Sequence, residues 1–123
     1  MGAAAPPLTG RKVLVVEDDY MIALDMRRSL AELGAEILGP AGRVEEALRL
    51  IGGAARIDGA VLDVTLHGAM VFPVADALRE RGVPFVFATG YEFSSLPPRF
   101  AEVPHFEKPV DPLTIARCLA SLG

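Results

Sequence analysis

The sequence predicts a single α/β domain in which helices alternate with the strands of a parallel sheet. Short apolar runs that suit buried strands recur along the chain, and segments with the apolar spacing of helices lie between them. Glycine or proline marks most of the boundaries. The length of 123 residues is that of one domain, and a hydrophobic fraction of 51% excludes a mostly disordered chain.

Five short segments are predicted as strands, because β-branched, leucine or aromatic residues dominate them. They are Lys12–Val16, Glu36–Leu38, Ala60–Leu66, Phe85–Ala88 and His105–Glu107. Consecutive parallel strands need right-handed crossovers, which place helices on both faces of the sheet. The expected architecture is therefore a doubly wound (βα)5 arrangement.

Four segments carry apolar residues at the spacing of an amphipathic helix. They are Tyr20–Leu33, Arg43–Ile51, the stretch from Pro73 to Gly82, and Leu113–Leu122. In the first helix, the predicted buried stripe consists of Met21, Leu24, Leu30 and Leu33. Asp19 and Asp111 precede two of these helices and are predicted to cap them.

The spacing of apolar residues is poor between Tyr91 and Pro104. Pro97, Pro98 and Pro104 prevent a long regular helix there, because proline lacks an N–H group and clashes with the preceding turn. The fourth crossover helix is therefore predicted to be short or irregular.

Charge and composition exclude several classes of protein. The net charge of −4 argues against nucleic acid as a partner, since phosphate binding needs a basic surface. No apolar run reaches the ~20 residues that span a membrane, so no membrane partner is expected. Cys118 is the single cysteine, which excludes an internal disulfide and a cysteine metal cluster; we expect it to be a small buried hydrophobe.

The first ten residues are small, contain proline and carry no charged side chain. They lack the basic start and the long apolar region of a secretory signal. We expect residues 1–10 to be a flexible lead-in to a domain that spans 11–123, and we expect the protein to be cytoplasmic.

Polar residues stand in or just after four of the predicted strands, near their carboxyl ends. Glu17 and Asp18 follow the first, Asp63 lies in the third, Thr89 follows the fourth and Lys108 follows the fifth. Because parallel strands end at the same edge of a sheet, these side chains are expected to converge. Ligands of open α/β sheets bind at that edge, so the convergence predicts a functional site.

Three carboxylates with one lysine carry an excess of negative charge. Two like charges ~4 Å apart repel by about 4 kcal/mol at an effective dielectric near 20. Either some carboxylates hold protons or a cation is bound, and oxygen ligands suit Mg²⁺, with Mn²⁺ as an alternative. A carboxylate beside such an ion can accept a phosphoryl group, while a lysine and a hydroxyl stabilise the phosphoryl oxygens.

Four short strings carry these residues: Val15-Val16-Glu17-Asp18, Leu62-Asp63, Ala88-Thr89 and Lys108-Pro109. In order and spacing they resemble the signature sites of the receiver domain of bacterial two-component response regulators. The resemblance covers nearly all of Lys12 to Leu122. It implies a flavodoxin-like fold with strand order 2-1-3-4-5, in a protein that is not an enzyme beyond its own phosphoryl transfer and dephosphorylation.

The resemblance also implies a metal site around the phosphoacceptor. Asp63 would accept the phosphoryl group. Asp18 would bind Mg²⁺ directly and Glu17 would bind it through water. Asp63 and the backbone carbonyl of Thr65 would complete the protein ligands.

The remaining signature residues would respond to the phosphoryl group. Thr89 would bind a phosphoryl oxygen and Lys108 would pair with the group. The Lys108–Pro109 bond is often cis in this family. His105 stands where most receivers have a Tyr or Phe that turns inward on activation. We expect His105 to be a partly buried aromatic spacer that serves with Thr89 as the switch.

A narrower resemblance is to the stand-alone receivers nicknamed FAT GUY after the string Phe87-Ala88-Thr89-Gly90. Phe72 to Leu78 also fits that subgroup, although Tyr91 follows Gly90 directly instead of one residue later. Members are associated with histidine kinases of the HWE and related types, and commonly have an irregular fourth helix.

Most receivers have a proline four residues after the phosphoacceptor, where this chain has His67. We therefore expect the loop after Asp63 to be looser than usual. Tyr91 and Phe93 are expected to form an exposed patch that binds a partner or to pack over an irregular loop.

The predicted function is a phosphorylation-controlled switch. A partner histidine kinase donates a phosphoryl group to Asp63, and the signal passes to a downstream protein or phosphotransfer partner, because no output domain follows Gly123. The chain is expected to be a monomer or weak dimer. The alternatives are a phosphorylation-independent interaction module and a small Mg²⁺-dependent phosphohydrolase, which would need a second acid two residues after Asp63, where Thr65 stands.

Overall fold

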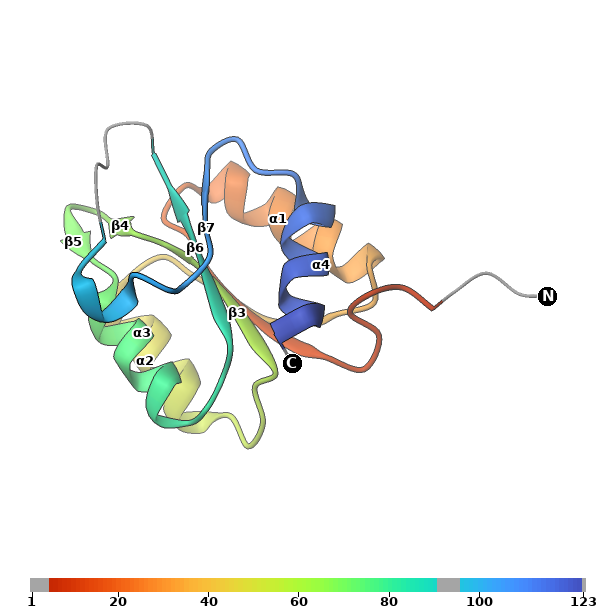
Figure 1. The fold of residues 1–123 in the computed structure, drawn as a ribbon, viewed down its shortest axis with the longest axis horizontal. Helices are drawn as coiled ribbons and strands as arrows, with labels where there is room; N and C mark the ends of the chain where they lie inside the picture. The colour runs from red at the N-terminus through yellow and green to blue at the C-terminus, as the bar shows by residue number, and fades with distance from the viewer. Residues whose placement is uncertain (1–4, 91–95, 123) are drawn as a thin grey trace.

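The structure is a computed structural model that describes residues 5–90 and 96–122. Five parallel strands form one sheet in the order β2-β1-β3-β6-β7, which confirms the predicted order (Figure 1). Their bounds are Lys12–Val16 (β1), Glu36–Ala41 (β2), Gly59–Asp63 (β3), Phe85–Thr89 (β6) and His105–Glu107 (β7). The predicted third strand thus ends at Asp63, three residues early.

Four α-helices flank the sheet in the described part of the chain: Tyr20–Glu32 (α1), Val44–Gly53 (α2), Phe72–Glu80 (α3) and Pro112–Leu122 (α4). Helices α2 and α3 cover one face, and α1 and α4 cover the other (Figure 1). The fold is therefore the predicted doubly wound, flavodoxin-like one. No helix in the described ranges is long and apolar enough to cross a membrane.

Each strand divides its side chains between two apolar cores, because successive residues point to opposite faces. Leu14 and Leu62 pack with the core under α2 and α3. Val13 and Val61 pack with the core under α1 and α4. Burial on both faces explains why the strands are continuous apolar runs rather than alternating ones.

Helix α1 begins as predicted but buries a different stripe. The Asp19 side chain caps it by accepting hydrogen bonds from the N–H groups of Met21 and Ile22, at 3.0 and 3.1 Å. Met21 itself is 71% exposed. The buried residues of the helix are Ala23, Met26 and Leu30, at a spacing of three and four. Met21 was therefore wrongly assigned to the core, and it stands beside the sheet edge where the strands end.

The connection between β6 and β7 contains only a 3-10 turn, Pro98–Phe100 (η1), in its described residues 96–104. This confirms the prediction of a short or irregular fourth helix. Phe100 is fully buried and stacks on Phe72 with ring centroids 5.6 Å apart. The Arg99 guanidinium lies over the Phe100 ring and donates two hydrogen bonds of 3.1 Å to Asp76 of α3. Ring and guanidinium together hold the turn on α3.

Within the segment 1–10, expected to be a flexible lead-in, Leu8 contacts the domain. Leu8 is fully buried in the core under α1 and α4. Its N–H donates to the Leu33 carbonyl at 3.0 Å. Gly34, at φ +103°, accommodates the approach, because a Cβ there would lie 2.7 Å from the Thr9 nitrogen. Burial of one leucine thus ties the segment to the end of α1.

After Asp63, where a loop was expected, the chain forms a two-stranded antiparallel hairpin. Its strands are Thr65–Leu66 (β4) and Ala69–Met70 (β5). The two residues of the turn, His67 and Gly68, have φ values of 47° and 82°. Such a pair of left-handed residues is characteristic of the tightest hairpin turn.

Candidate functional site

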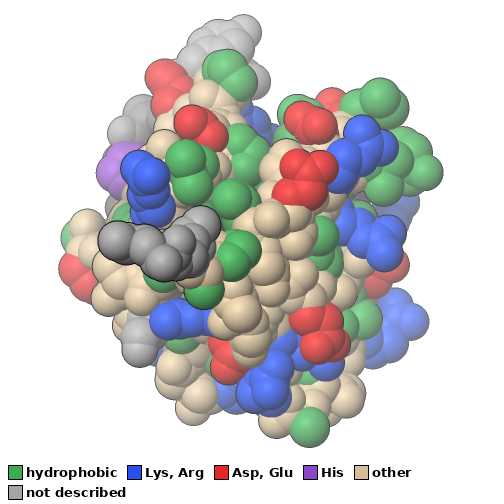
Figure 2. Space-filling view, turned by 90° about the vertical axis from the view of Figure 1, so that its right-hand side faces the viewer, with side chains coloured by type: hydrophobic (Ala, Val, Ile, Leu, Met, Phe, Trp, Pro, Cys, Tyr) green, Lys and Arg blue, Asp and Glu red, His purple; other side chains and the backbone are tan. Residues whose placement is uncertain are grey.

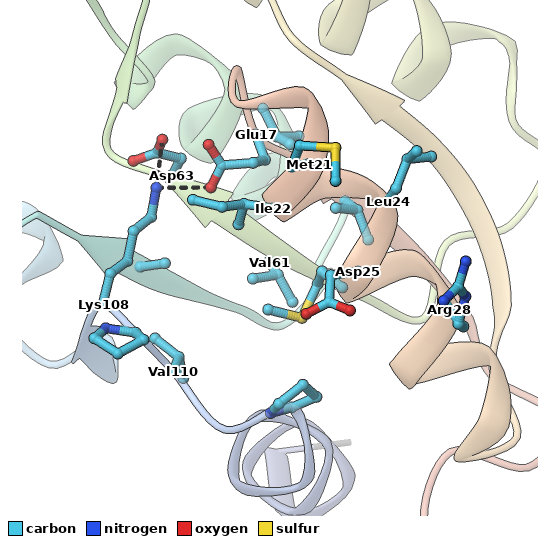
Figure 3. A pocket seen from close by; sticks show the side chains of 16 residues that line it. Glu17, Met21, Ile22, Leu24, Asp25, Arg28, Val61, Asp63, Lys108 and Val110 are labelled. Carbon is cyan, nitrogen blue, oxygen red and sulfur yellow. Dashed lines mark hydrogen bonds and ion pairs between the residues drawn. The ribbon is translucent and has the colours of Figure 1, made fainter.

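The carboxyl ends of β1, β3 and β7 bring one lysine and two acids together. Lys108 Nζ lies 2.7 Å from Glu17 Oε1 and 2.9 Å from Asp63 Oδ2 (Figure 3). Both carboxylates are buried, each with 7% of its surface exposed. A single ammonium therefore compensates two buried acids, as the convergence of strand ends predicts.

Asp18 adds a third carboxylate to this cluster. Glu17, Asp18 and Asp63 each offer an oxygen, and these oxygens all lie within 4.8 Å of one another. Three carboxylates with one ammonium leave an excess of negative charge, which a divalent cation would neutralise. An all-oxygen donor set with an excess of charge fits Mg²⁺ or Mn²⁺ rather than a metal that prefers sulfur or nitrogen ligands.

The proton affinities follow from this crowding. Burial raises the pKa of Glu17 to about 7, against the lowering effect of Lys108 and of the Asp19 N–H, and the Asp63 charge raises it further. Burial would lower the pKa of Lys108, but its bonds to Glu17 and Asp63 raise it overall. The lysine is therefore firmly charged, while Glu17 sits near the midpoint of its titration at neutral pH.

Asp18 behaves in the opposite way. Burial alone would raise its pKa, but the hydrogen bond from the His67 N–H, followed by those with Glu17 and Asp63 and the His67 charge, lowers it overall. The His67 N–H donates to Asp18 Oδ2 at 2.8 Å. The loop that was expected to be looser is therefore tied to Asp18. A backbone N–H has no signature in the sequence, which is why this contact was missed.

Thr89 is the last residue of β6, and Thr65 stands two residues after Asp63. Thr89 is buried, and its hydroxyl donates to the Phe106 carbonyl of β7 at 3.4 Å. The Thr65 N–H donates to Asp63 Oδ1 at 3.4 Å. Asp63 is thus held by Thr65 from one side and by Lys108 from the other. The Lys108–Pro109 bond is cis, as the family resemblance implied.

His105 lies on β7, where its Cα pairs with that of Phe87 on β6. His105 is exposed, so the expectation that it is a partly buried aromatic spacer is wrong. The pattern of β7 explains this, since only Phe106 of its three residues is partly buried.

Tyr91 and Phe93 lie outside the described residues. Cys118 is half-buried rather than buried, and burial raises the pKa of its thiol.

A groove of about 450 Å³ leads from the cluster along α1 toward α4. Glu17, Asp63 and Lys108 line one end, and Asp25 and Arg28 lie farther along it (Figure 3). Figure 2 shows the face that carries these helices, with hydrophobic side chains in its hollow and charged ones at its edges. The rest of the lining is mostly apolar, from both helices and from the strands below: Val15, Val16, Met21, Ile22, Leu24, Met26, Val61, Ala88, Pro109, Val110 and Pro112.

Comparisons with known proteins agree with this geometry. No protein-family model matches the chain, and no curated protein sequence matches it. Among solved structures, SdrG from Sphingomonas melonis Fr1 is 38% identical, covers 94% of this chain and 97% of its own, and has a TM-score of 0.79. A structure of the BeF3-activated conformation of SdrG from Pseudomonas melonis Fr1 is 36% identical over 98% of this chain and 100% of that one, with a TM-score of 0.73.

The receiver domain of the hybrid histidine kinase CckA is 28% identical, with 90% of this chain and 97% of that one covered and a TM-score of 0.73. A response regulator receiver protein from Sinorhizobium medicae WSM419, 21% identical over 91% of this chain and 93% of that one, shares the fold with a TM-score of 0.76. Fold, identity and coverage agree. The chain belongs to the receiver-domain family of response regulators.

Proposed function

We propose that the protein is a phosphorylation-controlled receiver whose Asp63 accepts a phosphoryl group from a partner histidine kinase. The observation that carries the proposal is the position of Lys108 Nζ, within 3 Å of oxygens of both Asp63 and Glu17. Asp18 adds a third carboxylate within 4.8 Å of these two, which leaves an excess of negative charge, and a site for a phosphoryl group and a cation uses such a set.

The proposed reaction transfers a phosphoryl group without net redox chemistry. A carboxylate oxygen of Asp63 attacks the phosphorus of a phosphohistidine, the P–N bond breaks, and its electron pair stays on the imidazole nitrogen. The Lys108 ammonium moves from the Asp63 oxygen to an oxygen of the phosphoryl group. The protein thereby catalyses its own modification and its own dephosphorylation, and it is not an enzyme acting on other substrates.

Asp18 and Asp63 would hold Mg²⁺ directly, Glu17 through water, and the Thr65 carbonyl would complete the set, with Mn²⁺ as an alternative ion. When bound, the ion supplies positive charge that stabilises the phosphoryl oxygens. The residues present fit it, because the three acids already lie within 4.8 Å of one another and carry an excess of charge.

Phosphorylation would be communicated through Thr89. Its hydroxyl now bonds the Phe106 carbonyl, and a phosphoryl oxygen on Asp63 offers it a stronger, charged acceptor. If the Thr89 hydroxyl left the Phe106 carbonyl, the junction of β6 with β7 would change. His105, on β7, would take part in the switch. The related SdrG has a BeF3-activated conformation, which supports a comparable switch here.

We assign the chain to the FAT GUY subgroup on Phe87 to Gly90 and on its irregular fourth crossover. Its phosphodonor would then be a histidine kinase of the HWE or a related type in the cytoplasm. The downstream partner would be a protein or a phosphotransfer domain, and the chain a monomer or weak dimer.

The donor must reach Asp63, and the exposed apolar start of α1 offers it a surface. Tyr20, Met21 and Ile22 are 72%, 71% and 40% exposed, and the last two line the groove that leads to the cluster. Three exposed apolar residues in succession beside a reactive carboxylate are suited to binding a protein. We therefore place the kinase contact there.

The test is intact-mass spectrometry of the protein after incubation with Mg²⁺ and acetyl phosphate, with Asp63→Asn as the control. One phosphoryl adduct is expected in the parent, and none in the variant or with EDTA. Asn is nearly isosteric with Asp, so loss of the adduct reports the nucleophile rather than the fold. Failure to phosphorylate with either acetyl phosphate or a phosphorylated kinase, together with no Mg²⁺ binding, would refute the proposal and favour a phosphorylation-independent interaction module.

A further inference from the structure

The β4–β5 hairpin contacts Asp18 of the acidic cluster through the N–H of His67. We infer that this N–H positions Asp18, so that the hairpin sets the spacing between Asp18 and Asp63 that a divalent cation requires. His67 is thus a positioning residue that acts through its backbone. The inference rests on the proposed function, because Asp18 is a proposed metal ligand.

The turn makes the N–H available. His67 and Gly68 have φ values of 47° and 82°, and the flanking pairs are Leu66 with Ala69 and Thr65 with Met70. In a two-residue hairpin of this kind, the ladder does not use the N–H of the first turn residue. That N–H finds its acceptor in Asp18 Oδ2, at 2.8 Å. A carboxylate has a second oxygen, which can bind a cation while the first accepts this bond.

The base of the hairpin is fixed in the core. Leu66 and Val71 are fully buried, and the Val71 N–H donates to the Val64 carbonyl at 2.9 Å. The bond to Asp18 therefore comes from a short hairpin that the core anchors at both ends. A donor on such an element restrains the carboxylate better than solvent does.

The same hairpin reaches Asp63. The Thr65 N–H of β4 lies 3.4 Å from Asp63 Oδ1, while the turn holds Asp18. Asp18 and Asp63, which come from different strand ends, are thereby restrained by one short element, and this element also carries the proposed Thr65 carbonyl ligand. A proline at position 67 would have no N–H to donate, so the restraint requires a residue other than proline there.

Two substitutions separate the N–H from the side chain. His67→Gly keeps the N–H and tolerates positive φ, whereas His67→Pro removes the N–H and fixes φ near −65°. We expect isothermal titration to give a Kd for Mg²⁺ within about twofold of the parent for His67→Gly, and about tenfold weaker for His67→Pro. Equal Kd values for the two variants would overturn the inference.

A second variant removes the N–H without introducing a proline ring, in case His67→Pro disturbs the hairpin more widely. Phenyllactic acid at position 67 replaces the amide with an ester, and His67→Phe, which has the same side chain and a normal amide, is its control. The ester is expected to weaken Mg²⁺ binding about tenfold relative to that control. An ester variant that binds as tightly as His67→Phe would also overturn the inference.

A measurement without metal gives an independent readout. In EDTA, hydrogen exchange of the backbone amide at position 67 is expected to be slow in the parent and in His67→Gly. It is expected to be about tenfold faster in Asp18→Ala, which removes the acceptor. An exchange rate that Asp18→Ala does not change would contradict the contact. A parent that binds no Mg²⁺ would refute the metal site itself, whereas equal binding by His67→Pro and His67→Gly would refute only the positioning role.

Discussion

Lys108 donates to Glu17 as well as to Asp63: its Nζ lies 2.7 Å from Glu17 Oε1, closer than to Asp63 Oδ2 at 2.9 Å. The lysine is therefore shared between the proposed phosphoacceptor and a proposed metal ligand. One ammonium thus compensates both buried carboxylates, so the charges of Glu17, Asp63 and Lys108 depend on one another.

Replacing Lys108 by Met should destabilise the protein by about 1–3 kcal/mol at pH 8, because two buried carboxylates then face each other uncompensated. The loss should be smaller near pH 5, where Glu17 holds a proton. Urea denaturation at both pH values measures it. Adding Asp63→Asn to Lys108→Met removes one of the charges and should recover part of the loss. A double variant as unstable as Lys108→Met alone would contradict this account.

The free energy of unfolding in EDTA should fall as pH rises from about 5 to about 7. The pKa of Glu17 is about 7 in the folded protein against an ordinary 4.5, so the folded state binds the Glu17 proton more tightly than the unfolded state does. The stabilisation that this proton gives is complete below about pH 4.5 and is lost as the pH rises to about 7. Glu17→Gln cannot titrate and should show a flatter dependence, so the difference between the two urea series isolates Glu17. Identical series would contradict the raised pKa.

Mg²⁺ affinity should rise over the same window, since Glu17 must be ionised to join the site.

Met21→Arg should slow phosphotransfer from a phosphorylated partner kinase about tenfold, because it places a charge on the proposed docking surface. Labelling by acetyl phosphate should change by less than about twofold, since a small donor needs no surface. Leu122→Arg, an exposed apolar residue at the end of α4, is the matched control and should affect neither rate. Equal slowing with both donors would show that Met21 acts on the site rather than on docking.

Arg99→Ala should loosen the connection between β6 and β7. The guanidinium lies 4.6 Å from the Phe100 ring centroid and bonds Asp76 twice, so its loss removes one tie from the turn to α3, while the stacking of Phe100 on Phe72 remains. Because the ion pair is about half exposed, the expected destabilisation is only about 1 kcal/mol, with faster amide exchange at residues 98–103. Arg27→Ala, on the exposed side of α1, should leave that exchange unchanged.

Leu8→Ala should destabilise the protein by about 2–3 kcal/mol, as for a buried core leucine. Leu122→Ala makes the same chemical change at a partly exposed position and should cost less than about 0.5 kcal/mol. Thermal denaturation of the two variants decides whether the segment before β1 belongs to the folded domain. Equal melting temperatures for the parent and Leu8→Ala would mean that the segment is dispensable.

The sequence by itself determined the strands, the helices between them and the edge at which Glu17, Asp18, Asp63, Thr89 and Lys108 meet, whereas the order of the strands in the sheet came from the family resemblance. These features follow from local patterns. Apolar runs buried on both faces identify the strands, and parallel connections bring their carboxyl ends to one side. The irregular crossover after β6 was equally predictable, because proline acts on its own backbone.

Only the tertiary structure decided which groups touch. The lysine is shared by Glu17 and Asp63, the His67 N–H holds Asp18, and Leu8 fills a core beneath α1. Met21 could be placed outside the core only once α1 was docked. Each of these contacts joins residues far apart in the chain or uses a backbone group that nearly every residue carries, so no local pattern encodes it. The sequence predicted which chemistry gathers at the sheet edge, and packing decided its geometry.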